Sequence, residues 1–347
     1  MSTTDESGKA RATIREIASA AGVSIATVSR VLNERPGVAA ETRGQVLRVV
    51  RDHGFTANRS ARALSGGRTG LIGVMLPIVE AAYFTSILAG TSEALYEQDM
   101  RMVLCPTLHH HEREVTLLDR LMHGTTDGAV LMLPEESNEE LKMLRRKGYA
   151  FVIVDPRVKL DEGIPAVSAS NASGSREATE HLLALGHRHI GVIQGPKTFL
   201  ASSERLNGFN GAMAAAGVMP DPRLVLESRF DIEGGVKAAA RLLDAAEPPT
   251  AIFAFNDNTA IGALRVARER GIRVPEDLSI VGFDDSEHSA IVTPTLTTVR
   301  QPLAEMGRMA VSLLLRLLDN QRLEALHIEL KTRLIVREST GPVPVRR

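Results

Sequence analysis

Apolar residues near the start of the chain recur at the spacing of a short helix. In "GVSIATVSRVLN", residues 22–33, Val28, Val31 and Leu32 repeat at i, i+3 and i+4 and therefore share one helix face. Ser24 is placed to cap the start of this helix, because its hydroxyl can accept a hydrogen bond from a free backbone N–H group. The pattern predicts a short helix that packs its apolar face on neighbouring helices.

Two more helices are predicted around this one. The stretch "TIREIASAAG" has apolar residues at helical spacing and stops at Gly22, since glycine is a common helix terminator. The stretch "AETRGQVLRVVRDHGF" predicts a third helix, with Val46, Leu47 and Val50 facing inward. Two short helices joined by a glycine-containing turn and braced by a third form the helix-turn-helix pattern.

From residue 70 onward, apolar β-rich runs alternate with amphipathic helical stretches. Such runs joined by helices predict parallel sheets covered on both faces. Two sets of runs predict two similar, doubly wound α/β lobes, in which ligands bind beyond the carboxyl ends of the strands. The predicted strands are 70–76, 101–105, 128–133 and 150–155 in the first set, and 189–195, 224–228, 251–255 and 279–285 in the second. The predicted helices are 113–122, 139–147, 174–185, 203–216, 234–245 and 259–270.

A polar segment separates the predicted helices from the predicted lobes. In "TANRSARALSGGRTG", residues 56–70, Asn58 or Ser60 can cap a helical turn that runs through Leu64. This segment is too short and too polar to be a stable helix alone, so its structure is expected to be conditional. The predicted organisation is a disordered tail at 1–12, a helix-turn-helix domain at 13–57, a conditional helix at 58–66 and a core at 67–347.

Length and composition restrict the number of domains and the cellular compartment in which the protein can function. At 347 residues, 44% of them apolar, it is long enough for two or three domains with a sizeable core. No run approaches the roughly 18 apolar residues of a membrane span, and the first twelve residues lack the apolar region of a secretion signal. Cys105 is the single cysteine, so no intramolecular disulfide can form. These features predict a cytosolic protein with no membrane partner.

Charge is distributed unevenly along the chain. Residues 1–68 contain eleven Lys or Arg and six Asp or Glu, a net charge of +5, and the remainder carries a net charge of −6. A small basic head on a mildly acidic body suggests that only the head meets a polyanion such as nucleic acid.

The polar face of the second predicted helix has the residue types that contact bases. In a helix-turn-helix this helix lies in the major groove, where Arg30 can donate two hydrogen bonds to a guanine. Ile25 and Ala26 can pack on thymine methyl groups. The residues suited to hydrogen bonds with phosphates or base edges are Ser24, Thr27, Ser29 and Asn33. The alternative is a small helical bundle that binds another protein.

Leu64 is an apolar residue in the polar, basic segment "NRSARALSGG". Proteins that bend DNA insert such side chains between base steps from the minor groove, and Asn58, Arg59 and Arg62 can hold the neighbouring phosphates. We therefore expect Leu64 to act as a DNA wedge. The alternative is a linker leucine that packs on its own lobe.

Ordered motifs along the chain resemble those of the lactose-repressor/galactose-repressor (LacI/GalR) family of bacterial transcription regulators. "TIREIASAAGVSIATVSRVLN" is similar to the family's DNA-binding motif, and "NRSARALSGG" is similar to its hinge helix. "LGHRHIGVIQGP", "ERLNGF", "FNDNTAIGALR" and "SIVGFDDSEHS" resemble further family motifs in the same order. The resemblance extends from Thr13 to about Ser339.

The resemblance implies a homodimer that binds a palindromic operator in double-stranded DNA through paired heads and hinges. It places Ile25, Ala26 and Arg30 at the family's base-contacting positions and Leu64 at its intercalating position. It also implies a two-lobed core like that of periplasmic binding proteins. Its expected lobes are an N-lobe at about 70–168 and 299–325 and a C-lobe at about 169–296 and 327–340. The chain ends in "STGPVPVRR" and has no leucine heptads there, which favours a dimer over a tetramer.

Candidate effector-binding residues stand at predicted strand ends or in nearby helices. A sugar presents hydroxyl groups and apolar C–H faces, so its site needs carboxylates, amides, an arginine and an aromatic wall. Eight such residues match family effector positions: Tyr83, Phe84, Asp155, Arg205, Phe230, Asn256, Asp257 and Asp284. Tyr83 and Phe84 are predicted in a loop after the first strand. As alternatives, Asp257 can cap a helix or hold a turn, and Phe230 can be ordinary core packing.

The sequence favours a regulator over other classes. "HHHE" at 109–112 has no second ligand set for a metal, and no nucleophile elbow, GxGxxG or phosphate loop is present. We therefore expect neither an enzyme nor a cofactor. The predicted function is a repressor released by a small sugar. Alternatives are the same fold responding to a nucleobase, a nucleoside or a protein corepressor, and a solute-binding protein for transport.

Overall fold

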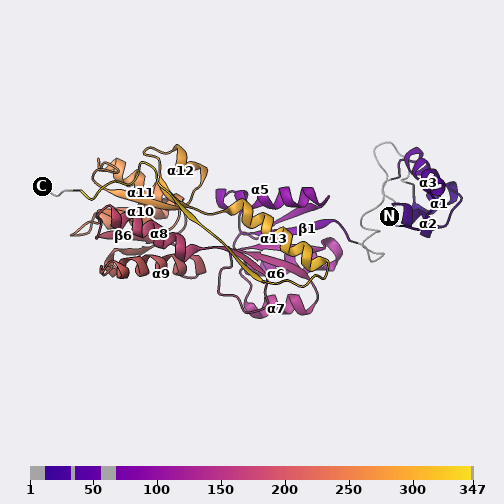
Figure 1. The fold of residues 1–347 in the computed structure, drawn as a ribbon, viewed down its shortest axis with the longest axis horizontal. Coiled ribbons are helices and arrows are strands. Elements are labelled where there is room, and N and C mark those ends of the chain that lie inside the picture. The colour runs from indigo at the N-terminus through magenta and orange to yellow at the C-terminus, as the bar shows by residue number, and fades with distance from the viewer. Residues whose placement is uncertain (1–11, 33–35, 56–67, 345–347) are drawn as a thin grey trace. The chain divides into compact units, whose positions relative to one another are not determined.

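The computed structural model describes residues 12–32, 36–55 and 68–344, and the chain divides into two compact units, the first ending at Thr69 and the second beginning at Gly70 (Figure 1). The first unit contains α1 (Ile14–Ala20), α2 (Ile25–Leu32) and α3 (Ala40–Asp52). Helix α1 starts with a capping box between Thr13 and Glu16. At the start of α2, the Thr27 backbone N–H donates to Ser24 Oγ at 3.1 Å, which confirms the predicted cap.

The first unit is a three-helix bundle around a small apolar core. Val28 and Val31 of α2 are buried against Ile17 of α1 and Val46 of α3, as their spacing predicts. The prediction that Leu47 faces inward is wrong, because its side chain is 42% exposed. The inward arc of α3 follows the i, i+3, i+4 spacing from Val46, and Leu47 lies one position outside it.

The second unit contains two six-stranded sheets, each of which forms one lobe. Strand order is β11-β5-β4-β3-β1-β2 in the N-lobe and β12-β10-β9-β8-β6-β7 in the C-lobe. All pairs are parallel except β10 with β12. The N-lobe strands are β1 (Leu71–Leu76), β2 (Arg101–Pro106), β3 (Gly128–Met132), β4 (Ala150–Val154), β5 (Ala166–Ala169) and β11 (His327–Leu330). The C-lobe strands are β6 (Ile190–Gln194), β7 (Val225–Glu227), β8 (Ala251–Ala254), β9 (Ser279–Asp284), β10 (Thr297–Arg300) and β12 (Arg333–Ile335).

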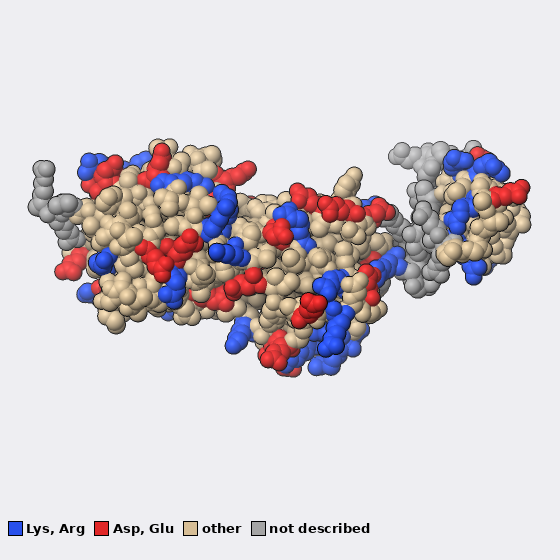
Figure 2. Space-filling view, viewed as in Figure 1, with Lys and Arg blue, Asp and Glu red and all other residues tan. Residues whose placement is uncertain are grey.

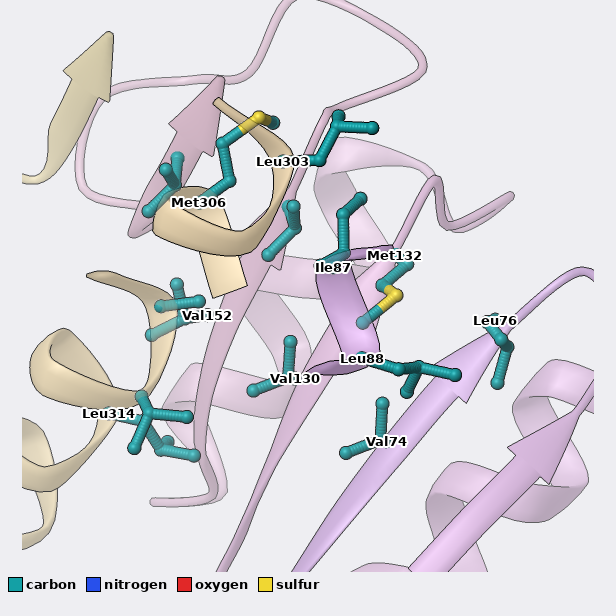
Figure 3. Packing of buried hydrophobic residues seen from close by; sticks show 14 of the residues in the cluster. Val74, Leu76, Ile87, Leu88, Val130, Met132, Val152, Leu303, Met306 and Leu314 are labelled. Atoms are coloured by element: carbon teal, nitrogen blue, oxygen red, sulfur yellow. The ribbon is translucent and has the colours of Figure 1, made fainter. Parts of the chain in front are cut away.

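Helices cover both faces of the N-lobe sheet. On one face α5 (Ala82–Glu97) and α13 (Leu303–Leu318) bury residues such as Val74, and Figure 3 shows Met306 and Leu314 of α13 pointing toward the strands. On the other face α6 (His111–Arg120), the π-helical turn η1 (Leu121–Thr125) and α7 (Asn138–Arg146) cover Met75 and its neighbours. Alternate residues of β1 thus enter different cores, as a doubly covered strand requires.

The C-lobe sheet is covered in the same way. Helices α8 (Asn171–Ala184) and α9 (Leu200–Ala215) pack on the face that contains Phe253, and α10 (Ile232–Leu243) and α11 (Asp257–Glu269) pack on the face that contains Ile252. Two short elements, η2 (Pro222–Leu224) and α12 (Glu287–Ile291), complete the lobe. The prediction of two doubly wound α/β lobes behind a helical head is confirmed.

The chain crosses between the lobes three times, at 169–171, 300–303 and 330–333. Figure 1 shows the last crossing as an extended yellow segment that runs from the N-lobe into the C-lobe. Two predicted boundaries are therefore wrong. The first residues of the predicted 327–340 C-lobe segment form β11, which pairs with β5 of the N-lobe, and residues 299 and 300 end β10 in the C-lobe. The run "HIELKTRLIV" has no turn signal to mark where one sheet ends and the next begins.

The location of the two adjacent aromatic residues also differs from the prediction. Tyr83 and Phe84 lie in the first turn of α5 rather than in a loop. This start has no side-chain cap, so the sequence lacks the usual signal for it. Among the described residues, no helix is long and apolar enough to span a membrane.

Candidate functional site

The predicted DNA-contacting face of α2 is open to solvent in the first unit. Ser24, Ile25, Ala26 and Arg30 are exposed, and Ile25 keeps 44% of its surface accessible although it is strongly apolar. Thr27 and Ser29 are half-buried, and the Thr27 hydroxyl lies 2.9 Å from Ser24 Oγ, beside the cap. An arginine, an isoleucine and an alanine are thus presented on one short helix. The other candidates, Asn33, Asn58, Arg59, Arg62 and Leu64, lie outside the described residues.

A group of polar side chains occupies the region between the two lobes of the core. From the N-lobe, the Tyr83 hydroxyl donates a 2.6 Å hydrogen bond to Asp155 Oδ2. Asp155 directly follows β4, and its φ of 54° lies in the left-handed region, which is unfavourable for a side-chain-bearing residue. Strain of this kind collects at functional sites, where the surrounding structure compensates for it.

Arg205 of α9 is the C-lobe centre of this group. Its side chain is 4% exposed and lies with its guanidinium carbon 3.8 Å from the centre of the Phe283 ring. Nε donates to Asn171 Oδ1 at 2.9 Å, and Nη1 donates to the Phe255 carbonyl. These contacts fix the direction of the guanidinium before any ligand is present.

Asp284 is the last residue of β9, and its carboxyl group faces Arg205 of α9. Its Oδ1 lies 4.0 Å from Arg205 Nη1 and accepts a 2.7 Å hydrogen bond from Gln301 Nε2. Its φ of 121° is again unfavourable for a residue with a side chain. Gln301 was not predicted from the sequence, because it follows β10, a strand too short and polar to be recognised as an apolar run.

The pKa values show that groups of both lobes act on one another. Burial raises the pKa of Asp155, whereas the Tyr83 hydrogen bond and the charge of Arg205 oppose this rise. Burial also raises the pKa of Tyr83 well above its ordinary value, and Asp155 and Asp284 add to the effect. Burial raises the pKa of Asp284 to about 8, although Arg205 opposes the rise. Tyr83 and Asp155 of one lobe therefore share an electrostatic environment with Arg205 and Asp284 of the other.

Aromatic rings form one side of the group. The Phe230 ring is half-buried, and its centre lies 6.0 Å from the Arg205 guanidinium carbon and 5.9 Å from the Phe199 ring centre. Gly195 makes room for it, because a Cβ atom there would stand 2.0 Å from the Phe230 ring. Across the lobe boundary, Arg157 places its guanidinium carbon 4.8 Å from the Phe199 ring centre.

Three candidate residues have mainly structural contacts. Phe84 is 7% exposed and packs in the N-lobe core, where its ring meets that of Tyr83 edge to face. Asn256 caps α11, because its Oδ1 accepts from the Thr259 backbone N–H at 2.9 Å. Asp257 is 1% exposed and accepts hydrogen bonds from the Ser286 backbone N–H and the Thr298 hydroxyl. These contacts position the neighbouring residues of the site.

The group offers a ligand more acceptors than donors. Asp155 and Asp284 supply carboxyl groups. Glu204 of α9 supplies another, which accepts a 3.0 Å hydrogen bond from Asn171 Nδ2. Burial raises the pKa of Glu204, and the nearby charge of Asp155 raises it further. Arg205 is the cation among them. Such a set can hold a neutral molecule rich in hydroxyl groups. Within the described residues, no group of three or more His, Cys, Asp or Glu is placed to hold a metal ion.

Comparisons with protein families agree with the two units. Residues 13–58 match the family described as bacterial regulatory proteins, lacI family. Residues 179–340 match the periplasmic binding protein-like domain. The first match contains all three helices of the head, and the second contains most of the C-lobe and the last two crossings.

Full-length relatives and solved structures match as well. The HTH-type transcriptional regulator DegA of Bacillus subtilis (strain 168) is 36% identical over 96% of this chain and 99% of that protein. A complex of the transcriptional regulator CelR with cellobiose is 33% identical, with a TM-score of 0.73 over 95% of this chain and 100% of that one. The lac repressor dimer bound to operator and the anti-inducer ONPF is 28% identical, with a TM-score of 0.84 over 95% of this chain and 99% of that one.

Proposed function

Because this chain belongs to the lacI family of bacterial regulatory proteins, we propose that it is a repressor that binds a palindromic operator as a homodimer and is released when a small sugar binds between its lobes. That it is a DNA-binding transcriptional regulator follows from the family itself. The proposal concerns the sign of regulation, the assembly and the effector.

The operator and the dimer are supported by the head and by one solved relative. Arg30 and Ile25 are exposed on the helix that enters the major groove in a helix-turn-helix. The lac repressor structure is a dimer bound to its operator. A dimer places two such helices on two half-sites, which is why a palindrome is the expected target.

The sugar is supported by the group of acceptors between the lobes. This is the observation that carries the proposal: Asp155 of the N-lobe and Asp284 of the C-lobe converge on Arg205, beside the half-buried ring of Phe230. Acceptors of this kind fit the hydroxyl groups of a sugar, and the ring fits its C–H face. The CelR structure holds cellobiose.

A nucleoside is the second candidate effector. The Phe230 ring, next to Phe199, can also stack on a planar base, whereas the carboxylates can hold ribose hydroxyl groups. A protein corepressor has no comparable support among the described residues.

The mechanism is a coupling between two sites. A ligand that contacts both lobes changes their relative position, and with it the distance between the paired hinge segments. A coupling free energy of about 1–3 kcal/mol lowers operator affinity by roughly 5–150-fold. Because the ligand acts on the core and the DNA on the head, each site can be disabled separately.

The test is an operator-binding titration of the full chain. A palindrome is selected from random duplexes, and binding is measured by fluorescence anisotropy with and without glucose, galactose, ribose, cellobiose and adenosine. We expect Arg30→Ala to abolish preference for the palindrome and Leu64→Ala to weaken binding and bending without changing ligand affinity. Arg265→Ala is the matched control, because Arg265 is an exposed residue on the surface of α11 in the C-lobe. No preference for any palindrome over random duplex at moderate salt would refute operator binding.

A further inference from the structure

Exposed cationic side chains gather at one corner of the N-lobe, where α6 and α7 end. Arg145 and Arg146 lie in the last turn of α7, and Lys147 follows this helix directly. Arg120 is the last residue of α6, which covers the same face of the sheet. All four side chains are exposed, and within the described part of the chain none of them has an acidic partner. We call these four residues the cationic corner.

The cationic corner lies at the edge of the sheet where the chain arrives from the head. The backbone N–H group of Gly70, the first residue of the second unit, donates to Asp127 Oδ2 at 2.9 Å. Thr126 holds its hydroxyl group 2.7 Å from that of Tyr149, which follows Lys147 by two residues. These contacts lie at the amino ends of the strands, whereas the site between the lobes lies at the carboxyl ends. The corner is therefore separate from that site.

The excess of cations is local. Residues 69–347 carry a net charge of −6, which predicted that only the head meets a polyanion, but such a sum averages over the whole surface of the core. Helix α5, on the other face of the same sheet, has no cation in its last turn and ends on Glu97. Figure 2 shows blue side chains over the end of α7 and red ones along α5.

The helix ends alone do not account for these cations. A helix C-terminus favours a cation, because its free carbonyl groups carry a partial negative charge that acts over about one turn. One cation satisfies this preference, whereas the end of α7 has three. Unpaired cations of this number are typical of a surface that meets an anionic partner.

The chemistry of the corner fits the phosphate backbone of a nucleic acid. Protein–DNA interfaces are polar and strongly positive, whereas the centres of protein–protein interfaces are depleted in charge. Arginine and lysine neutralise phosphates without contacting base edges, so they add affinity for any sequence. A regulator of this family already holds duplex DNA through its head, and this edge of the core is the one joined to the head.

We propose that the cationic corner is a second DNA-contacting surface, which binds the phosphate backbone of the duplex beside the segment that the head holds. This inference goes beyond the proposed function, which assigns DNA contact to the head and the hinge. It requires only that the chain binds DNA, and it is independent of the palindrome, the sign of regulation and the sugar.

The first experiment measures the salt dependence of binding to random duplex. The full chain is titrated against a labelled duplex of about 40 bp between about 50 and 200 mM salt. The corner variant combines Arg145→Gln, Arg146→Gln and Lys147→Gln. We expect its affinity at the lowest salt to fall at least about tenfold, and its slope of log affinity against log salt to be shallower by about 3 per protomer.

A matched control separates contact from general charge. Arg241→Gln, Arg265→Gln and Arg268→Gln remove the same charge from exposed positions of the C-lobe. The slope of this variant should stay within about 0.5 of wild type, because distant charges are screened. A corner variant whose slope changes by less than about 1, or by no more than that of the control, overturns the inference.

Duplex length then tests where the contact lies. A duplex of about 20 bp, which holds only the two half-sites of a selected palindrome, is compared with one of about 40 bp that adds flanks. We expect the corner variant to bind much more weakly than wild type on the long duplex and almost equally on the short one. A defect of equal size on both duplexes overturns the assignment to flanking DNA. If no palindrome is preferred, operator binding fails, and the random duplex still judges the corner.

An acidic protein is the other partner that such a corner could meet. Polyglutamate is therefore titrated against wild type, the corner variant and the control. Polyglutamate binding that is lost in the corner variant, while the DNA salt slope is unchanged, assigns the corner to an acidic protein and overturns the inference. If the corner variant does not fold, Arg146→Gln and Lys147→Gln are measured singly, each with an expected slope change of about 1. No change in either slope overturns the inference in the same way.

Discussion

In the C-lobe, buried carboxyl groups meet cations and hydroxyl groups, whereas in the N-lobe Glu114 and Glu136 lie close to each other. Asp285 accepts from Arg337 Nη2 at 2.5 Å and also from Arg300, and Asp257 accepts from a hydroxyl and a backbone N–H group. Burial opposes ionisation of Asp285, but its arginine hydrogen bonds hold its pKa below the ordinary value. Asp285 thus keeps a fixed negative charge, whereas burial raises the pKa of Asp257, which has no arginine partner, to about 6.

The N-lobe pair behaves differently although its sheet has the same architecture. Glu114 of α6 and Glu136, which follows β3, are 1% and 3% exposed. Burial raises their pKa values to about 6 and about 8, and the charge of Glu114 adds to the rise at Glu136. Glu114 accepts from the Glu135 backbone N–H at 2.9 Å, but both oxygens of Glu136 lack a partner among the described residues. The same layers can therefore bury either a fixed charge or a proton, depending on the donors nearby.

The largest effect is expected at Arg205, the cation of the site between the lobes. Arg205→Ala removes the contacts with Asn171 and Phe283 and leaves Asp284 without its cation. We expect a loss of about 3–5 kcal/mol in the free energy of unfolding, because the change leaves a cavity beside Phe283 and leaves buried acceptors of Asn171 and Phe255 without a donor. Urea denaturation of the full chain measures it, with Arg265→Ala as the exposed control. A loss below about 1 kcal/mol would mean that the charges are solvated.

A somewhat smaller loss is expected at Asp285. Asp285→Ala deprives Arg300 and Arg337 of their shared carboxylate, and about 2–4 kcal/mol should be lost at neutral pH. Since the folded pKa of Asp285 is depressed, wild type should lose this contribution as pH falls below the ordinary value of 3.8. Asp244→Ala, which breaks an exposed pair with Arg270, is the control. Equal unfolding midpoints for the two variants would contradict the difference between buried and exposed pairs.

The Glu114–Glu136 pair of the N-lobe predicts a pH dependence of stability opposite in sign to that of Asp285. The folded pKa of Glu136 is about 8 and its ordinary value is 4.5, so wild type should lose stability as pH rises from about 4.5 through 8. Glu136→Gln removes that loss and should raise the free energy of unfolding by about 1–3 kcal/mol at pH 8. The gain should vanish at pH 4. Thermal unfolding across this range measures it, and Glu139→Gln, exposed at the start of α7, should show no such trend.

The smallest effect is expected at an exposed ion pair. Glu269→Gln breaks the 2.8 Å contact with Arg265 on the surface of α11. Exposed pairs contribute little, so we expect a change within about 0.5 kcal/mol that disappears in high salt. A loss above about 1 kcal/mol in the free energy of unfolding would contradict the expectation that exposed ion pairs contribute less than buried ones.

Elements with strong local patterns could be predicted from the sequence. All eight predicted strands are present, and central ones such as β1 and β3 are continuous apolar runs whose residues enter two cores. Strands β5, β10, β11 and β12 were missed, since they are three or four residues long and are held by pairing with strands distant in sequence. Tertiary pairing, which no local window contains, defines them.

The site was predicted in part for the same reason. The proximity of Asp155 and Asp284 could be predicted because carboxyl ends of parallel strands meet at one edge, whereas Arg205 of α9 was a candidate through the helical stretch "SSERLNGF" and its resemblance to the family. Their partners could not, because Gln301 reaches Asp284 from a crossing segment, and Arg205 stacks on Phe283 of another strand. The structural contacts of Asn256 and Asp257 likewise depend on residues such as Thr298, distant in sequence.

The three crossings of the chain between the lobes also have a consequence for its synthesis on the ribosome. Helix α13 and β11 complete the N-lobe, and β12 follows them into the C-lobe. A ribosome that has translated only the first 300 residues has therefore released neither lobe in complete form. Each nascent sheet keeps an unfinished edge until its last strand emerges, which is β11 for the N-lobe and β12 for the C-lobe. Premature termination before β11 would consequently leave both lobes without an edge strand, whereas termination between β11 and β12 would affect only the C-lobe sheet.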